Sequence, residues 1–155
     1  MPLTKAILVE ETLSIFETPL KALGYKYSSK YFDYKYFGFY KKSLELNLYL
    51  HIEFQAKGFG LDDLFDLAIN LIRDTRLDLH TPRQPWRNNE PVARFSSRLS
   101  PKIYQPGSVG IDHWWHFVTI EEARSELNDI YDKLINYGIP YLENPNSQDV
   151  RYIRN

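Results

Sequence analysis

One stretch of the sequence, residues 43–55, alternates between apolar and polar side chains at every position. An apolar residue at every second position forms one face of a β-strand and cannot form one face of a helix. The stretch therefore predicts a strand of about 12 residues at the centre of a sheet, longer than most strands. The glycine-rich residues 57–60 predict a turn after it. The apolar positions are Leu44, Leu46, Leu48, Leu50, Ile52 and Phe54.

The N-terminal region, residues 1–23, predicts a helix. Its apolar side chains mostly recur every three or four positions, and Thr4 is suited to cap the first turn. Pro19 cannot donate a hydrogen bond within a helix, so the helix either kinks there or ends near Glu17. Gly24 follows the last apolar position, where a left-handed residue commonly ends a helix.

A second helix is predicted over residues 120–137, where apolar side chains recur with the same spacing. Thr119 and Glu122 have the spacing of a reciprocal capping box at its start. Gly138 is predicted to close this helix, and Pro140 to prevent its continuation.

The remaining segments predict further strands and irregular connections. The aromatic residues of 25–42 favour two short strands. Residues 62–73 fit a helix and a strand equally well, because a short apolar run carries no decisive period. Residues 92–99 alternate as a strand, and the proline-containing stretches on either side of it, 74–91 and 100–112, predict long loops.

Together these elements predict a single α+β domain over residues 1–143, followed by a polar C-terminal tail over residues 144–155. The predicted fold is an antiparallel sheet of about five strands with the N- and C-terminal helices packed on one face. A length of 155 residues is typical of one domain. The opposite face of the sheet then carries the polar side chains of the central strand.

Composition excludes several kinds of site and environment. The chain has no cysteine, which excludes disulfides, thiolate zinc sites and thiol nucleophiles. Its formal net charge is −1, so no overall field favours nucleic acid or an anionic membrane. No apolar run reaches the roughly 18 residues of a membrane span, and the first residues lack the pattern of a secretory signal. We therefore expect a cytoplasmic protein without a membrane partner.

Six short motifs follow one another along about residues 12–143: Leu23-Gly24-Tyr25, Phe54-Gln55, Ile69-Asn70-Leu71, Arg94 to Arg98, Trp114-Trp115 and Tyr137-Gly138-Ile139-Pro140. In this order they resemble domain of unknown function family 4304, small bacterial proteins without an established activity. The resemblance implies that residues 64–73 form a strand. It implies no activity, because the family supplies none.

The polar face of the central strand offers the first candidate site. Tyr49, His51 and Glu53 share that face, and the side chains of His51 and Glu53 are about 7 Å apart, within reach of a general-base pair. Arg94 and Arg98 share one face of their own strand and suit carboxylates or phosphates. If the strands are neighbours, these residues form a cluster. The interpretation that we favour is an ordinary polar face with cross-strand ion pairs.

The sequence Asp112-His113-Trp114-Trp115-His116 offers a second candidate site. An extended chain places the two histidines on opposite faces, although a turn could bring them together. Zinc sites need three or four well-placed protein ligands, so we expect no metal and no cofactor. The favoured interpretation is that one of Trp114 and Trp115 anchors the core while the other lies across a cleft or a partner surface.

The segment 25–42 offers a third candidate site. It carries nine aromatic residues, and its five lysines against one aspartate give a local charge of +4. Interleaved aromatic and basic residues are typical of platforms that bind single-stranded nucleic acid. Tyrosines in strands and lysines on edge strands are also ordinary, and we favour that interpretation.

These observations give three functional hypotheses. The leading one is a non-catalytic module that binds another protein, because Tyr, Trp and Arg are enriched at binding hot spots. An immunity-like role in a bacterial conflict system is one specific form of it. The second is an enzyme or small-ligand-binding protein that uses His51, Glu53, Arg94 and Arg98. The third is a protein that binds single-stranded nucleic acid through residues 25–42.

Overall fold

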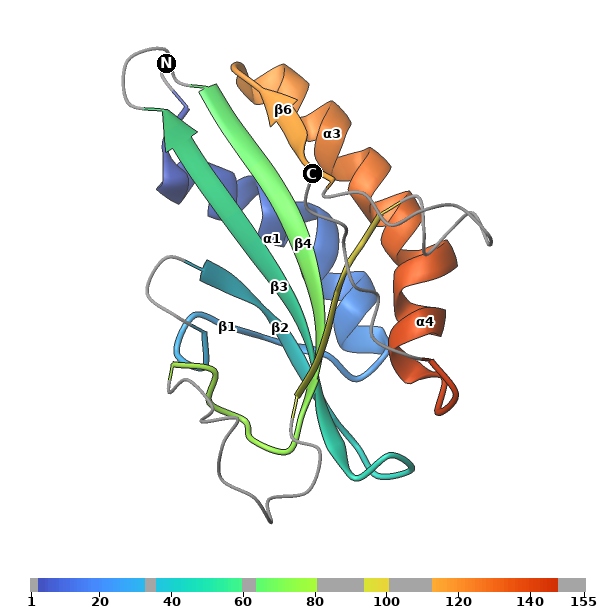
Figure 1. The fold of residues 1–155 in the computed structure, drawn as a ribbon. Coiled ribbons are helices and arrows are strands. Elements are labelled where there is room, and N and C mark those ends of the chain that lie inside the picture. Colours follow the sequence, from blue (N-terminus) through green and yellow to red (C-terminus); the bar gives the residue numbers. More distant parts are fainter. Residues whose placement is uncertain (1–2, 33–35, 60–63, 81–93, 101–112, 148–155) are drawn as a thin grey trace, which may run out of the picture.

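The computed structural model describes residues 3–32, 36–59, 64–80, 94–100 and 113–147. The fold is α+β as predicted, with an antiparallel sheet and helices from both ends of the chain on one of its faces (Figure 1). No helix of the described residues is long and apolar enough to cross a membrane. In chain order the elements are α1 (Lys5–Ala22), β1 (Lys26–Ser28), β2 (Tyr36–Ser43), β3 (Leu48–Phe59), β4 (Leu64–Asp74), β5 (Arg94–Arg98), β6 (Trp115–Phe117), α3 (Ile120–Lys133), the π-helical turn η1 (Leu134–Gly138) and α4 (Ile139–Glu143).

The strands of the sheet follow chain order from β1 to β5, and each neighbouring pair is antiparallel. β3 and β4 pair over nearly their whole lengths and form the centre of the sheet. The far side of β4 pairs with two strands, β5 along its C-terminal half and β6 near its N-terminal end. This arrangement brings β5 and the segment around β6 to the same edge of β4.

The central strand has the predicted length but a later start. β3 has 12 residues and begins at Leu48, not near residue 43. Residues 44–47 form the turn between β2 and β3, where Asn47 has φ 53° and the side chain of Leu44 is 88% exposed. The alternation of the sequence continues into this turn because side-chain periodicity does not record where strand pairing stops.

The segment that fits a helix and a strand equally well is a strand. β4 has buried side chains on both faces, with Leu67, Ala68 and Ile69 all fully buried. A strand covered on both faces reads as a continuous apolar run, which explains why its period is ambiguous. The turn predicted at residues 57–60 is wrong for Lys57, Gly58 and Phe59, since these residues continue β3 and pair with β4.

The N-terminal helix is capped and closed as predicted. Thr4 Oγ1 accepts a hydrogen bond from the Ile7 N–H at 3.2 Å. Gly24 has φ 92°, and its N–H donates to the carbonyl of Lys21 at 3.0 Å, which completes the end of α1. The helix does not end near Glu17: α1 continues through Pro19 to Ala22.

The C-terminal helix begins at the predicted cap. The Glu122 N–H donates to Thr119 Oγ1 at 3.0 Å. The Glu122 carboxylate accepts from the N–H of Val118 at 2.9 Å, one residue earlier than the reciprocal bond of a capping box.

The predicted end of this helix at Gly138 is wrong. Gly138 has a helical φ of −70°, and η1 leads directly into α4. The prediction that Pro140 prevents continuation is also wrong, since Pro140 lies within α4, in its first turn. A Cβ on Gly138 would lie 2.8 Å from the Leu134 side chain, so the glycine serves close packing and not a left-handed turn.

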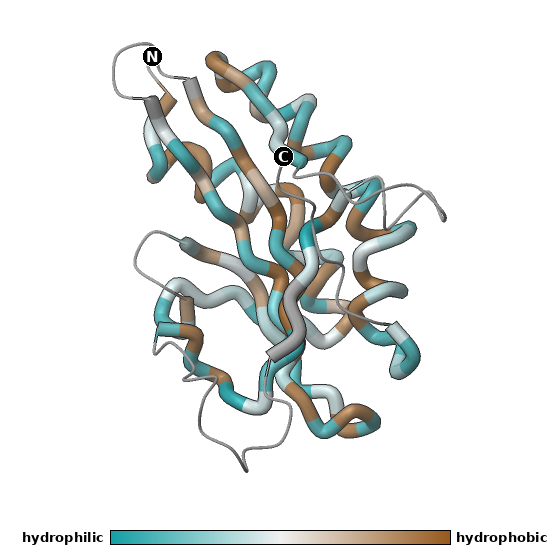
Figure 2. The backbone as a smooth tube through the Cα atoms, viewed as in Figure 1, coloured by the Kyte–Doolittle hydropathy of each residue, from teal (hydrophilic) through white to brown (hydrophobic). Residues whose placement is uncertain are grey.

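The sheet face toward the helices forms the main core. Leu50, Ile52 and Phe54 of β3 are fully buried in it. Phe16 of α1 meets Phe54 edge-on, with 5.3 Å between the ring centroids. Figure 2 shows the alternation of hydrophobic and hydrophilic residues along the strands that produces this face.

The opposite face of the sheet is divided into two parts. At one end residues 29–32 and 75–80 fold over it, and we call these two segments the cap. Phe32 and Leu79 of the cap bury Ile72 of β4 in a second small cluster, and the Leu79 N–H donates to the carbonyl of Tyr31 at 2.7 Å. Beyond the cap lies the open face, which no described helix covers. Its polar and aromatic side chains include Gln55, Lys57, Asp66, Asn70, Arg98, Trp114 and His116, with Glu53 at its border and the buried Ala68 among them.

Candidate functional site

A row of polar side chains crosses the open face from β3 to β5. The strand register places Glu53 opposite Asn70, and Asn70 opposite Arg98. Asn70 Nδ2 lies 2.8 Å from Glu53 Oε1 and 3.2 Å from Gln55 Oε1, and donates to these acceptors. Arg98 Nη2 donates to the same Gln55 oxygen at 3.4 Å. Glu53 and Arg98, named together from the sequence, therefore lie in one row with β4 between their strands.

The two ends of the polar row differ in burial. Glu53 is only 5% exposed, whereas Asn70, Gln55 and Arg98 are half-buried. A buried carboxylate is costly unless hydrogen bonds replace its lost water, and the Asn70 amide provides one. The row thus has a buried acidic end and a more accessible basic end.

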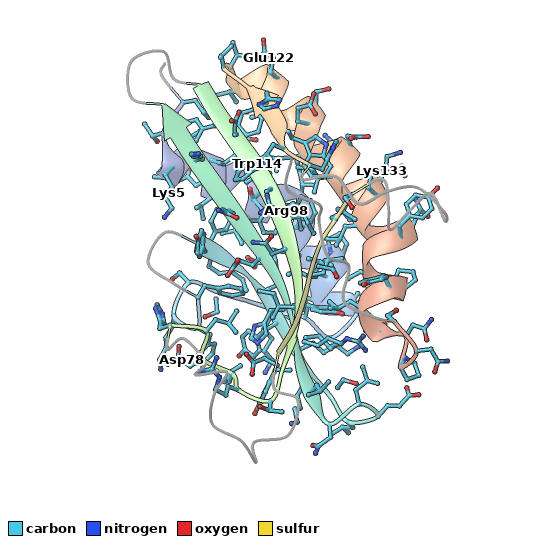
Figure 3. All side chains as sticks on the ribbon, in the orientation of Figure 1. Lys5, Asp78, Arg98, Trp114, Glu122 and Lys133 are labelled. Carbon is cyan, nitrogen blue, oxygen red and sulfur yellow. The ribbon has the colours of Figure 1, made fainter. Side chains whose placement is uncertain are left out.

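Trp114 lies against the basic end of the row. The Arg98 guanidinium carbon is 4.7 Å from the centre of the Trp114 ring system, within the range of a cation–π interaction. Figure 3 shows the two side chains together over β4, on the face that no described helix covers. Trp114 is half-buried, so part of a large aromatic surface stays accessible next to a cation.

Trp115 points to the other face and anchors the core. Its side chain is 4% exposed, and its Nε1–H donates to Asp129 Oδ2 of α3 at 3.0 Å. Neighbouring residues of an extended chain point to opposite faces, which separates the roles of the two tryptophans. Only Trp114 of the pair is accessible for binding.

His51 and Tyr49 lie on the same face of β3 as Glu53, toward the end that carries the cap. His51 is fully buried beneath the cap, where the Phe32 ring lies edge-on at 5.6 Å and the Arg76 carbonyl lies 3.4 Å from Nε2. Tyr49 is half-buried, and the Lys42 ammonium lies 4.4 Å from its ring centroid. His51 therefore holds the cap, and the geometry gives no accessible pair of His51 with Glu53.

The backbone of Arg94 pairs with Asp74 at the end of β5, and its side chain lies outside the described residues. Asp112, which belongs to the second candidate site of the sequence, lies outside them as well. The positions of these two residues in a site therefore stay predictions.

The two histidines of the tryptophan segment lie on opposite faces. The His113 ring packs edge-on against Trp115 at 4.3 Å, whereas His116 Nδ1 pairs with the Asp66 carboxylate of β4. Within the described ranges, no three or more His, Asp and Glu side chains gather to hold a metal ion.

Several carboxylates lie near His116 of β6. Burial raises the pKa of Glu126 on α3, and the nearby carboxylates of Asp129 and Glu122 raise it further. The nearby His116 lowers the pKa of Glu126. The charges on and beside the open face are therefore mixed in sign.

Much of the aromatic surface of residues 25–42 lies inside the protein. Tyr25, Phe32, Phe37 and Phe39 are fully buried, and such rings cannot stack on bases. The other described aromatic residues of the segment are half-buried; they are Tyr27, Tyr31, Tyr36 and Tyr40.

Sequence reasoning names Asn70 only within the motif Ile69-Asn70-Leu71 and misses it as the site residue that joins the two ends of the polar row. One signal could have found it: Asn70 is a polar residue within an apolar run, and a polar side chain in a central strand requires a hydrogen-bond partner. The partner itself depends on the register between β3 and β4, which a single sequence does not specify.

Compared with protein-family models, curated proteins and solved structures, the chain matches none. The resemblance to domain of unknown function family 4304 stays a prediction from the sequence.

Proposed function

We propose that this protein is a binding module that recognises another protein through the open face of its sheet. The observation that carries the proposal is the pair of Arg98 and Trp114, which lie 4.7 Å apart on the face without described helices. Tryptophan and arginine are the residue types most enriched among the few that dominate binding energy at protein interfaces.

The surroundings of this pair support its use as an anchor. Arg98 belongs to β5 and is hydrogen-bonded to Gln55 of β3, so two strands position its guanidinium. A side chain that is already ordered loses less conformational entropy when a partner binds. The half-buried Trp114 adds apolar area beside the charge, which is the composition of an interface core.

The chemistry of the pair indicates the chemistry of the partner. An arginine held against an aromatic ring favours carboxylate oxygens in its plane and apolar atoms above the neighbouring ring. The mixed charges of Lys57, Asp66 and His116 around the pair make a uniformly charged partner unfavourable. We therefore expect a folded protein that presents an acidic side chain next to an apolar one.

A second function is favoured by one specific observation, the burial of Glu53. An acid that is 5% exposed and is linked through Asn70 and Gln55 to an arginine also suits a small-ligand site or an active site on the sheet. The substitution Glu53→Gln keeps the shape but removes the charge. It is expected to abolish binding of a small cationic or hydroxylated ligand, and to leave recognition of a protein by Arg98 and Trp114 nearly unchanged.

Photo-crosslinking in cells of the source organism tests the proposal. A photoreactive amino acid placed at Lys57, on the open face, is expected to capture one protein, whereas the same group at Asn128, on an exposed position of α3, is not. Capture at Lys57 should disappear in the Trp114→Ala variant. Equal capture from both positions, or capture unchanged by Trp114→Ala, would contradict the proposal.

A further inference from the structure

The first strand leaves one edge of the sheet available. β1 pairs with β2 on one side, and no strand of the described residues pairs with its other side. Alternate backbone N–H and C=O groups of an edge strand point outward and can pair with an added strand. β1 has only three residues, so backbone bonds alone would hold such a strand weakly.

A groove of about 660 Å³ lies beside this edge. Its wall on one side is α1, through Glu17 and Lys21, and on the other side the chain from Gly24 to Tyr27. Grooves between an edge strand and a helix suit an extended peptide, because backbone pairing and side-chain pockets act together there. The groove thus supplies the contacts that a three-residue strand lacks.

Hydrogen bonds hold the floor of the groove in place. The Tyr25 N–H donates to the carbonyl of Leu20 at 2.9 Å, which ties the chain to the end of α1. The buried Tyr25 ring is held at its hydroxyl, which donates to Glu143 Oε1 at 3.2 Å, and the Lys41 ammonium binds the same oxygen at 2.6 Å. An extended peptide would therefore meet a preformed surface.

The charges of the groove select the peptide. Lys21 and Lys26 are exposed at its rim, and Glu17 is the one carboxylate among the described lining residues. A carboxylate near the two ammonium groups is favoured, and a further cation is not. A second copy of this chain pairing through β1 is a poor occupant, because Lys26–Ser28 carries a lysine and no acidic side chain.

We propose that an extended, acidic segment of a partner protein binds along the free edge of β1. Its backbone pairs with Lys26–Ser28, alternate side chains enter the groove against α1, and an acidic side chain lies between Lys21 and Lys26. This site is distant in the fold from the pair of Arg98 and Trp114 at the other side of the sheet, and it does not depend on the function proposed for that pair.

Selection and binding measurements with the full chain test this site. A phage-displayed library of random dodecapeptides is selected on the immobilised protein, and the consensus peptide is measured by fluorescence anisotropy. We expect an acidic consensus whose binding is about tenfold weaker in Lys26→Glu and in Lys21→Glu. Lys57→Glu, an equal charge change on the open face, and Trp114→Ala should leave the affinity within about twofold.

Two further measurements keep the test decisive. Replacing the acidic residue of the peptide by lysine should restore binding to Lys26→Glu, which a merely unfolded variant would not allow. Amide shifts on peptide addition should centre on residues 24–28. The proposal is overturned if no peptide is enriched, if Lys57→Glu or Trp114→Ala weakens binding as much as Lys26→Glu, or if sedimentation shows a dimer that Lys26→Glu dissociates.

Discussion

The two faces of the sheet are built from alternate residues of the same strands, and different forces act between the side chains on each face. On the helix-covered face Phe54 contacts the rings of Phe16, Phe37 and Phe39, and non-directional burial dominates. On the open face the next residue, Gln55, accepts hydrogen bonds from Asn70 and Arg98. Burial contributes most to stability, whereas directional groups contribute to recognition. We therefore expect stability to depend on the first face and binding on the second.

The largest effect on stability is expected when the helix-covered face loses the ring of Phe54. Phe54→Ala removes a fully buried aromatic side chain and should lower the free energy of unfolding by about 3–5 kcal/mol. The matched variant is Gln55→Ala on the open face, for which we expect a loss of about 1 kcal/mol. Urea unfolding of both variants gives the comparison, and equal losses would refute the division between the faces.

The next effect concerns the border between the cap and the sheet. A Cβ on Gly38 of β2 would lie 2.0 Å from the carbonyl oxygen of Ile52 and 3.0 Å from the Phe32 ring. Gly38→Ala should therefore lower stability by about 1–3 kcal/mol through overpacking. Gly58→Ala is the control, since its Cβ would meet the Phe65 ring at 3.3 Å. A Gly38→Ala protein as stable as wild type in thermal unfolding would contradict the role of this close approach.

Substituting phenylalanine for each of the two adjacent tryptophans makes the same chemical change on each face of the sheet. Trp115→Phe leaves a cavity in the core and removes the hydrogen bond to Asp129, so we expect a loss of about 1–2 kcal/mol. Trp114→Phe on the open face should change stability by less than about 0.5 kcal/mol. Denaturant midpoints of the two variants measure both effects, and a larger loss for Trp114→Phe would reverse the assignment of the two side chains.

The smallest expected effect is on the pH dependence of stability, to which Glu11 of α1 and Glu126 of α3 contribute in opposite directions. Hydrogen bonding to Arg124 lowers the pKa of Glu11, whereas burial raises that of Glu126. The stability from Glu11 is therefore present above its ordinary pKa and is lost as the pH falls through its lowered pKa. Glu126 acts in the opposite sense, since stability increases as the pH falls through its raised pKa.

Carboxyl-carbon NMR titration of the two glutamates checks these directions. The substitution Arg124→Gln should move the pKa of Glu11 upward and leave that of Glu126 nearly unchanged. A Glu11 that titrates above its ordinary value in the wild-type protein would show that the ion pair does not form in solution.

Periodicity predicts which side of the sheet is buried better than it predicts where elements end. The alternation around Leu50, Ile52 and Phe54 gives the core face, and the helix caps at Thr4 and Thr119 lie where their side chains require. The predicted ends near residue 43 and at Gly138 are wrong. The first depends on where β2 and β3 stop pairing, at Ser43 and Leu48, and Gly138 is needed to pack against Leu134 and Leu99.

For the candidate site too, the sequence predicts the strand face on which a residue lies but not its partner on the neighbouring strand. Sequence spacing places Glu53 and Arg98 on polar strand faces, but their row exists only because Asn70 of β4 lies between them. The pairing order of strands far apart in the chain is not contained in local spacing. The burial of His51 also depends on the cap, whose Phe32 and Leu79 come from two separate segments.

The most direct test of the proposed recognition surface is the affinity of the crosslinked partner, measured by calorimetry with purified proteins. We predict that Trp114→Ala weakens binding by about 30-fold or more, as expected for a hot-spot residue, while Trp115→Phe leaves the affinity of the folded protein within about threefold. An affinity unchanged by Trp114→Ala, with a large loss caused by substitutions on the exposed side of α3, would place the interface on the helical layer and contradict the account.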